Sequence, residues 1–364
     1  MTDRVHQFLS QLSIAHPIIQ APMAGGITTP ELVSAVSAAG GLGSFGAAYM
    51  RPDELRSAIH HVQKNTSCPY QVNLFVPDKT INYKPQHHTQ ALERLKNIYE
   101  AYGVNLDTES AKPRDDFENQ IKVVLEEKTP VVSFTFGIPD PSILIQLRQA
   151  GTFIIGTATC VAEAMELVDA KVDAIVAQGF EAGGHRGTFH STLRNSKEIP
   201  NIGLFSLVPQ LVDKIKIPII ASGGIMDGKG ILAALILGAA AVQLGTAFMG
   251  CPEAQLPESW RQALFHSSDT DTSLTHVFSG RHARGIGNHF MKEMNDVYTH
   301  IPPFPFQNAL TGPLRAEAKR RDDAQYQSLW AGQTARLTRR LPVAQLMQAF
   351  VKEIESAAHQ MNAF

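Results

Sequence analysis

The stretch IPIIASGGIMDGKGILAALILGAAAVQLGTAFM, residues 217–249, decides the fold class of this 364-residue chain. Its apolar runs at 218–222 and 241–248 are short and rich in Ile, Val and Ala, as buried parallel strands are. The segment between them, 227–237, predicts a helix. Glycine and polar residues interrupt 230–249, which favours a helix followed by a strand over a membrane span. The stretch therefore predicts a strand, a helix and a second strand.

The same alternation continues outward along most of the chain. Six more strands are expected at 17–21, 42–48, 70–76, 131–137, 153–158 and 174–178. Helices are expected at 30–39, from 51 onward, and at 114–128, 141–150, 160–170 and 204–214, with Thr29 capping the first of them. A doubly wound open sheet would carry GxGxxG after its first strand, but PMAGGITTP follows here. The pattern therefore predicts an α/β protein, a TIM (β/α)8 barrel.

The pattern changes after the eighth expected strand. Residues 250–335 are rich in Pro, His and Arg and lack clean alternation, and helical patterning returns near the C-terminus. We expect a barrel at 1–249, an added helical subdomain over the barrel mouth at 250–335, and C-terminal helices at 336–364 that pack back on the barrel.

Composition excludes several classes of partner. The chain has 32 basic and 34 acidic residues, a net charge of −2, which gives no field for nucleic acid or anionic lipid. The three cysteines, Cys68, Cys160 and Cys251, show no CxxC spacing, so neither a disulfide framework nor a zinc site is expected. The N-terminus has no long apolar core of a signal peptide. A cytoplasmic protein without nucleic-acid or membrane partners is predicted.

Glycine dominates the expected ends of the last two strands, where barrel active sites lie. Gly223 and Gly224 follow one strand, and Gly245 with Thr246 follows the next. Glycines allow close approach of the backbone to a phosphate, and the corresponding loops of many barrels bind one. The alternative is that these glycines only form tight turns. The expected strand ends lack the carboxylate pairs or lysines that metal, glycosidase or Schiff-base chemistry needs.

His185 follows two glycines at the end of the sixth strand. An imidazole titrates near neutrality, so this side chain is a candidate general base. The alternative is a loop histidine that is hydrogen-bonded to a carbonyl. We expect Glu181 to accept backbone N–H groups of its loop, and hence to be structural.

Amide side chains stand at three separate strand ends, at Asn73, Gln178 and Gln243. A ring with several donors and acceptors, such as an isoalloxazine, needs such groups. Each amide could instead satisfy the backbone at the top of the barrel.

Taken together, these segments resemble the nitronate monooxygenase family, flavoproteins formerly called 2-nitropropane dioxygenases. The matching segments are QAPMAGGITTPELVSAVSAAGGLG (20–43), AQGFEAGGHRG (177–187), residues 217–249, NALTGPLR (308–315) and LWAGQ (329–333). The resemblance implies an FMN-dependent oxidation of alkyl nitronates, and of some neutral nitroalkanes, by O₂ to a carbonyl compound and nitrite.

The resemblance also implies roles for particular residues. His185 is the expected catalytic histidine, acting as base on neutral nitroalkanes. The expected FMN contacts are Met23, Asn73, Gln178, Gly183, Gly223, Gly224, Gln243, Leu244, Gly245 and Thr246. Further flavin neighbours are expected at 331–333, and the substrate mouth at 304–306. No metal is expected. A small nitronate and O₂ are the expected partners, with a homodimer as the candidate assembly.

Two other enzymes share this barrel and most of these motifs. One is an FMN-dependent NAD(P)H:quinone reductase, and the other is an enoyl-thioester reductase. A non-catalytic flavin- or phosphate-binding barrel is the alternative from another class, which a retained His185 fits poorly. Because the first strand lacks a dinucleotide fingerprint, we expect no productive oxidation of NAD(P)H.

Overall fold

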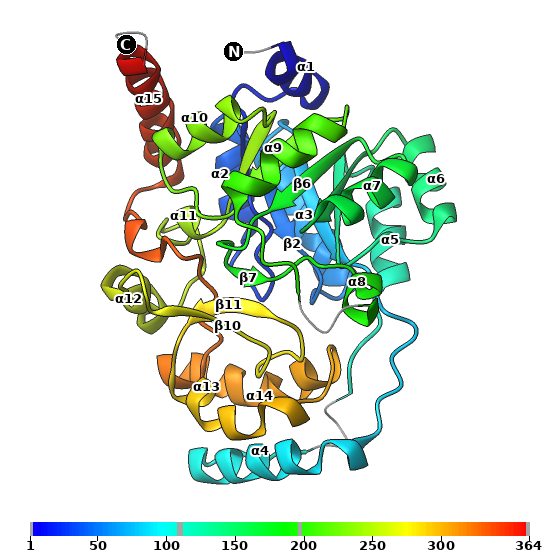
Figure 1. The fold of residues 1–364 in the computed structure, drawn as a ribbon, viewed down its shortest axis with the longest axis vertical. Coiled ribbons are helices and arrows are strands. Elements are labelled where there is room, and N and C mark those ends of the chain that lie inside the picture. Colours follow the sequence, from blue (N-terminus) through cyan, green and yellow to red (C-terminus); the bar gives the residue numbers. More distant parts are fainter. Residues whose placement is uncertain (1–2, 108–111, 196–198, 362–364) are drawn as a thin grey trace.

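The computed structural model describes residues 3–107, 112–195 and 199–361, and its centre is a barrel of eight parallel strands (Figure 1). The strands are β1 (Ile18–Gln20), β2 (Gly43–Gly46), β3 (Tyr70–Phe75), β4 (Val131–Thr135), β5 (Phe153–Ala158), β6 (Ala174–Gln178), β8 (Ile219–Ser222) and β9 (Ala241–Leu244). Their order is β1-β9-β8-β6-β5-β4-β3-β2. Two bonds of 3.0 Å, Gln20 N–H to Leu42 O and Leu42 N–H to Ile18 O, join the two edges. The predicted fold class is confirmed.

Helices separate the strands, as expected. They are α2 (Pro30–Ala38), α3 (Pro52–Asn65), α5 (Phe117–Glu126), α6 (Pro141–Gln149), α7 (Val161–Asp169), α9 (Leu204–Lys214) and α10 (Gly228–Ile236). The Thr29 side chain accepts the N–H of Leu32 at 3.0 Å and so caps α2. Asp227 caps α10 in the same way through the N–H of Gly230, at 2.8 Å.

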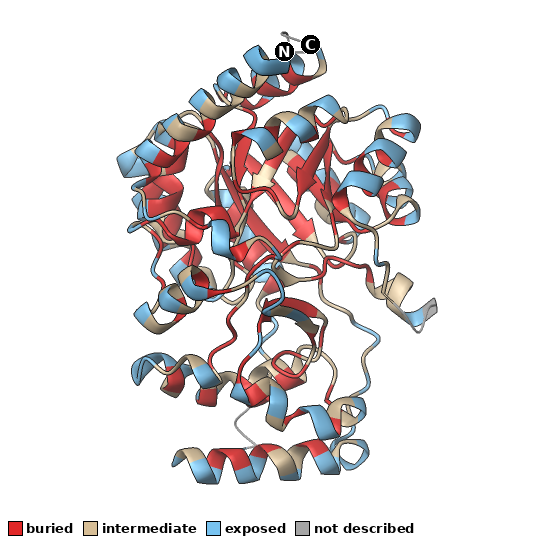
Figure 2. Cartoon of the chain, turned by 60° about the vertical axis from the view of Figure 1, so that its left-hand side comes forward, coloured by how far each residue is buried: buried red, intermediate tan, exposed pale blue. Residues whose placement is uncertain are grey.

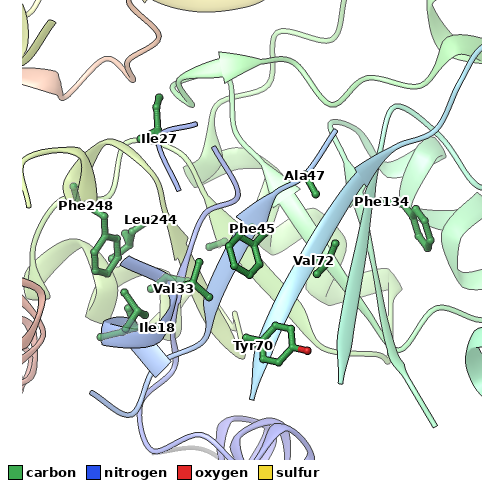
Figure 3. Packing of buried hydrophobic residues seen from close by; sticks show 14 of the residues in the cluster. Ile18, Ile27, Val33, Phe45, Ala47, Tyr70, Val72, Phe134, Leu244 and Phe248 are labelled. Carbon is green, nitrogen blue, oxygen red and sulfur yellow. The ribbon is translucent and has the colours of Figure 1, made fainter. Parts of the chain in front are cut away.

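The strands contribute residues to two hydrophobic clusters. Alternate strand residues such as Ile18, Phe45 and Val72 pack with Val33 of α2 in the layer between sheet and helices (Figure 3). The first residues of several strands pack instead with α1 (Asp3–Leu12), whose Phe8 ring lies 6.2 Å from that of Phe153. Helix α1 thereby closes the amino end of the barrel. The buried strands and the inward helix faces form one continuous interior (Figure 2), and the opposite, carboxyl end is left for a site.

The last barrel strand is shorter than the sequence predicts. It ends at Leu244, and residues Thr246–Met249 form the short helix α11 instead of continuing the strand. Gly245 makes the change of direction with φ −100° and ψ −76°. The apolar run 241–248 is equally compatible with both structures, because a buried strand and a buried helical turn have the same composition.

The subdomain is not wholly helical, so that part of the prediction is wrong. Besides α12 (Glu258–His266), α13 (His289–Glu293) and α14 (Phe306–Arg320), it contains the strands β10 (Thr272–Thr275) and β11 (Ala283–Ile286). These form an antiparallel sheet with β7 (Gly184–His185), which belongs to the loop after β6. A two-residue strand has no periodicity that sequence analysis can detect. The sheet ties the barrel loop to the subdomain.

The subdomain also includes a helix from far earlier in the chain. Helix α4 (Thr89–Tyr102), in the long excursion between β3 and β4, packs with residues of α13 and α14 in a separate hydrophobic cluster (Figure 1). At the other end of the chain there is one long helix, α15 (Val343–Met361), which packs against α10 and α2. The division at residues 249 and 335 stays a prediction.

Candidate active site

A hollow opens at the carboxyl ends of the barrel strands, with about 1160 Å³ of non-protein space including the part open to solvent. All eleven site residues proposed from the sequence line it: Met23, Asn73, Gln178, Gly183, His185, Gly223, Gly224, Gln243, Leu244, Gly245 and Thr246. The strands therefore bring together segments that are more than 200 residues apart in the chain.

The expected segments 331–333 and 304–306 are only partly at this hollow. Gly332 lines it, whereas Ala331 and Gln333 are not among the lining residues. Residues 304–306 are not among them either, although the Phe304 ring lies 6.0 Å from that of His185.

Glycines after β8 and β9 form a corner of free backbone donors. Within the described residues, the N–H groups of Gly223, Gly224 and Gly245 donate to no protein acceptor. Gly223 and Gly224 have φ of +123° and +71°, and a Cβ at Gly224 would lie 3.2 Å from the Cβ of Glu181. The Thr246 Oγ1 accepts the N–H of Gly332 at 3.0 Å, which leaves its own proton for a ligand. The corner fits an anion of phosphate size.

The three amides have different surroundings. The Gln178 side chain is used within the protein, because its Nε2 donates to the His185 carbonyl at 2.9 Å and its Oε1 accepts the Gly187 N–H at 2.8 Å. Asn73 donates through Nδ2 to the Ser133 Oγ at 2.8 Å. Gln243 makes no side-chain hydrogen bond with the described residues and faces the hollow. Gln243 is therefore the amide with the most freedom to bind a ring.

His185 lies on β7, where its backbone pairs with Ala283 of β11. Its Nε2 is 2.9 Å from the Oγ of Ser279, and that hydroxyl donates its only proton to the Arg281 carbonyl at 3.0 Å. We assign the imidazole proton to Nε2 on this network, so Nδ1 carries the free lone pair. The ring thus combines a fixed tautomer with one basic nitrogen.

The environment of His185 opposes its protonation. Rings of Phe75, Phe136, Phe304 and Trp330 surround the imidazole at centroid distances of 5.6–6.0 Å. Burial, with the charges of Arg281 and Arg315, lowers the pKa of His185 to about 3. The imidazole is therefore neutral at physiological pH.

The loop before His185 is held by buried hydrogen bonds. The Glu181 carboxylate accepts the N–H of Leu204 at 2.9 Å, which agrees with the structural role expected for it. Arg186, 1% exposed, donates to the carbonyl of Gly179 at 2.6 Å. These bonds hold the backbone that carries His185.

Sequence reasoning missed several residues of the site. Tyr49, Phe75 and Trp330 line the hollow, and Ser279 orients the histidine. Tyr49 lies just after one expected strand and Phe75 lies near the end of another, so their position was a usable signal. Trp330 lies inside the LWAGQ segment. Nothing in the sequence around Ser279 marks it as a partner of a residue 94 positions earlier.

The described part of the chain contains neither a helical membrane span nor a cluster of metal ligands. None of its helices has the length and apolarity needed to cross a bilayer. Within the same residues, no three His, Cys, Asp or Glu side chains are grouped so that they could hold a metal ion.

A closed (β/α)8 barrel with a glycine-lined anion corner and one histidine at its carboxyl end defines a class of protein, the barrel enzymes that act at this end of the fold. The nitronate monooxygenase family model matches residues 6–353, and the chain belongs to that family. It is therefore an oxidoreductase.

Relatives and solved structures agree with this membership. The chain is 44% identical to a "probable nitronate monooxygenase" of Staphylococcus saprophyticus over 94% of its length and 95% of the relative's. It is similar to a nitroalkane oxidase from Streptomyces ansochromogenes, with 37% identity, a TM-score of 0.89 and coverage of 97% and 99%. FabK from Thermotoga maritima follows at 29% identity, a TM-score of 0.76 and 98% of each chain.

Proposed function

We propose that the protein binds FMN and uses O₂ to oxidise alkyl nitronates to a carbonyl compound and nitrite. The observation that carries the proposal is the combination, in one hollow, of an anion corner of free N–H groups with a neutral histidine that has a free Nδ1. Family membership and the similar nitroalkane oxidase support the choice of substrate.

The residues present fit FMN. The N–H groups of Gly223, Gly224 and Gly245, with the Thr246 hydroxyl, would hold its phosphate. The uncommitted Gln243 amide, with Asn73, would face the ring, and Gln178 would instead hold the loop. Among the described residues no lysine or arginine lines the hollow, so backbone donors would carry the binding of the phosphate. When bound, the flavin supplies the electron acceptor that the side chains lack.

His185 has a task only with neutral nitroalkanes. A nitronate has already lost its α-proton, whereas a nitroalkane must first lose it. The C–H proton would pass to Nδ1 of His185, and its electron pair would form the C=N bond of the nitronate. Ser279 keeps the other ring nitrogen protonated, so Nδ1 stays available. The rings of Phe75 and Trp330 pack around the imidazole.

The proposal is tested on the purified yellow protein. Cofactor released by heat is expected to be FMN, one per chain. In an anaerobic stopped-flow experiment, ethylnitronate is expected to reduce the bound flavin and NADH at micromolar concentration is not. A colourless protein, or one whose flavin ethylnitronate leaves oxidised, would refute the proposal.

Because the chain is similar to FabK, we also consider a second function. A flavin-dependent reductase of thioesters or quinones would use the same corner and ring contacts, but would take its electrons from NAD(P)H. Rapid bleaching of the flavin by NADH, with no reaction of ethylnitronate, would establish that function instead. The homodimer and the cytoplasmic location stay predictions.

A further inference from the structure

A tyrosine that lines the active-site hollow has a hydroxyl group without a partner in the described residues. Tyr49 lines the hollow, and its ring and that of His185 both contact Phe75, at 5.9 Å each. Its hydroxyl oxygen is buried and has no hydrogen-bond partner among the described residues. Burial raises the pKa of Tyr49 to about 12, so the group is a donor at physiological pH. A buried donor without a partner is costly, which indicates that a ligand supplies the acceptor.

The charges near this hydroxyl indicate what kind of acceptor fits. Arg281 is 5% exposed and lies 3.7 Å from the ring centre of Phe136. It donates to the Thr188 carbonyl and to Nδ1 of His190, at 3.1 Å for the latter, and its Nε has no partner within the described residues. These partners are neutral, so the guanidinium keeps its positive charge uncompensated by direct contact.

Arg315 has the same kind of surroundings. Its Nη2 donates to the carbonyl and side-chain oxygens of Asn308, both at 2.8 Å, and its Nε to the Thr311 hydroxyl at 3.2 Å. Neither this arginine nor Arg281 forms an ion pair with a carboxylate of the described residues. The charges of both act on Tyr49 and on His185.

Two carboxylates, Glu163 and Asp78, act on Arg281 through space, but their hydrogen bonds and ion pairs are made with other groups. Asp78 pairs with Arg194 at 3.0 Å, and Glu163 accepts the N–H groups of Thr159 and Phe189. Two arginines without a carboxylate in contact and a hydroxyl without a partner therefore lie beside the hollow. An anion with an exposed oxygen satisfies both, because the hydroxyl donates to it and the field stabilises its charge.

We propose that Tyr49 donates a hydrogen bond to the anionic oxygen of the substrate, and that Arg281 and Arg315 supply the positive field that selects nitronates over neutral nitroalkanes. The inference rests on the proposed function and assigns the recognition of its anionic group. Tyr49 touches the substrate in this scheme, whereas the two arginines are positioning residues. The same field opposes a charged His185, so the site favours a substrate that arrives deprotonated.

Tyr49→Phe tests the hydrogen bond. The change is expected to raise KM for ethylnitronate by roughly 10- to 150-fold, the equilibrium factor of a hydrogen bond to a charged group, and KM for nitroethane by less than about threefold. Nitrate, a planar anion, serves as a probe that needs no turnover, and its Kd from the flavin spectrum of the holoenzyme is expected to rise in parallel. Tyr70→Phe is the matched control, since it removes a hydroxyl at the opposite end of the barrel.

The contribution of the two arginine charges is tested separately from that of the Tyr49 hydrogen bond. Arg315→Met is expected to weaken nitrate binding, and Arg315→Lys is expected to restore most of it. Arg281→Met and Arg281→Lys form a second pair of variants, for use if the protein does not tolerate the change at Arg315. Equal KM changes for the two substrates in Tyr49→Phe, or unchanged nitrate affinity in every variant, would overturn the inference. If wild-type protein oxidises no nitronate yet binds nitrate through Tyr49, the proposed function fails and the anion site stands.

Discussion

The low pKa of His185 leads to a prediction about acid pH. With a pKa of about 3, some 99% of His185 is neutral at pH 5, whereas an ordinary imidazole of pKa near 6.5 would be only about 3% neutral. If His185 is the base for neutral nitroalkanes, lowering the pH from 8 to 5 leaves the base form in place. We expect kcat/KM for freshly dissolved nitroethane to change less than about twofold over this range, against a loss of about 30-fold for an unperturbed histidine.

A low pKa also sets how the proton can be held after transfer. Imidazolium alone is disfavoured among the four aromatic rings and the arginine charges. Transfer from a nitroalkane, however, creates the nitronate beside it, and the two opposite charges stabilise each other in the enclosed site. The ion pair, rather than a higher pKa of the free enzyme, allows the step.

The assay compares steady-state rates on two substrates across pH, with His185→Asn as the second measurement. The variant is expected to lose about 10²- to 10⁴-fold on nitroethane, the usual contribution of a positioned base, and to retain most of its rate on ethylnitronate. A midpoint near pH 6.5 for nitroethane would contradict the burial argument. Equal losses on both substrates, measured at full flavin content, would refute the role of His185 as a base.

Three further outcomes follow from single contacts. Gly224→Asp places a carboxylate in the corner of free backbone donors and is expected to yield flavin-free protein. Gly103 has the same φ of +71° but open space around it, so Gly103→Asp is the control and should show a normal flavin absorbance. Ser279→Ala removes the hydroxyl acceptor that orients His185. It should lower kcat on nitroethane by roughly 2- to 12-fold, the factor of one neutral hydrogen bond. An unchanged kcat would exclude the orienting role. Burial lowers the pKa of His276 to about 4, so at pH 5 this imidazole is protonated in the unfolded chain but not in the folded one. Lowering the pH from 7 to 5 should therefore reduce the free energy of unfolding by about 2 kcal/mol on account of this group. In urea titrations, His276→Gln should remove that part of the pH dependence.

Much of the fold could be predicted from the sequence, because each barrel strand is a short apolar run bounded by turn residues. Thr29 is predicted as a helix cap from its residue type, and helix 204–214 is predicted from its apolar periodicity. Such local signals are sufficient where an element depends mainly on its own residues. The proposed site residues also converge, since all of them lie at strand ends and the fold brings those ends together.

What the sequence could not supply depends on distant partners. The pairing of Gly184 with Arg284 joins two segments 100 residues apart, and a glycine-containing strand of two residues has no pattern of its own. The bond between Ser279 and His185 has the same origin. The packing of α4 with α14 depends on where the excursion 77–130 folds back, which no local signal specifies.

Strand β7 has a consequence for how this enzyme can be divided. Because β7 pairs with β11, and the N–H of Arg186 donates to the His282 carbonyl at 2.8 Å, the loop that carries His185 is held jointly by the barrel and by the segment that follows it. A barrel expressed alone would lack the strand that orders this loop, and an exchange of the later segment between related enzymes would replace part of the active site. The two parts are not modules that recombination can shuffle freely, so substitutions between Thr272 and Ile286 will change turnover even where they never meet the substrate.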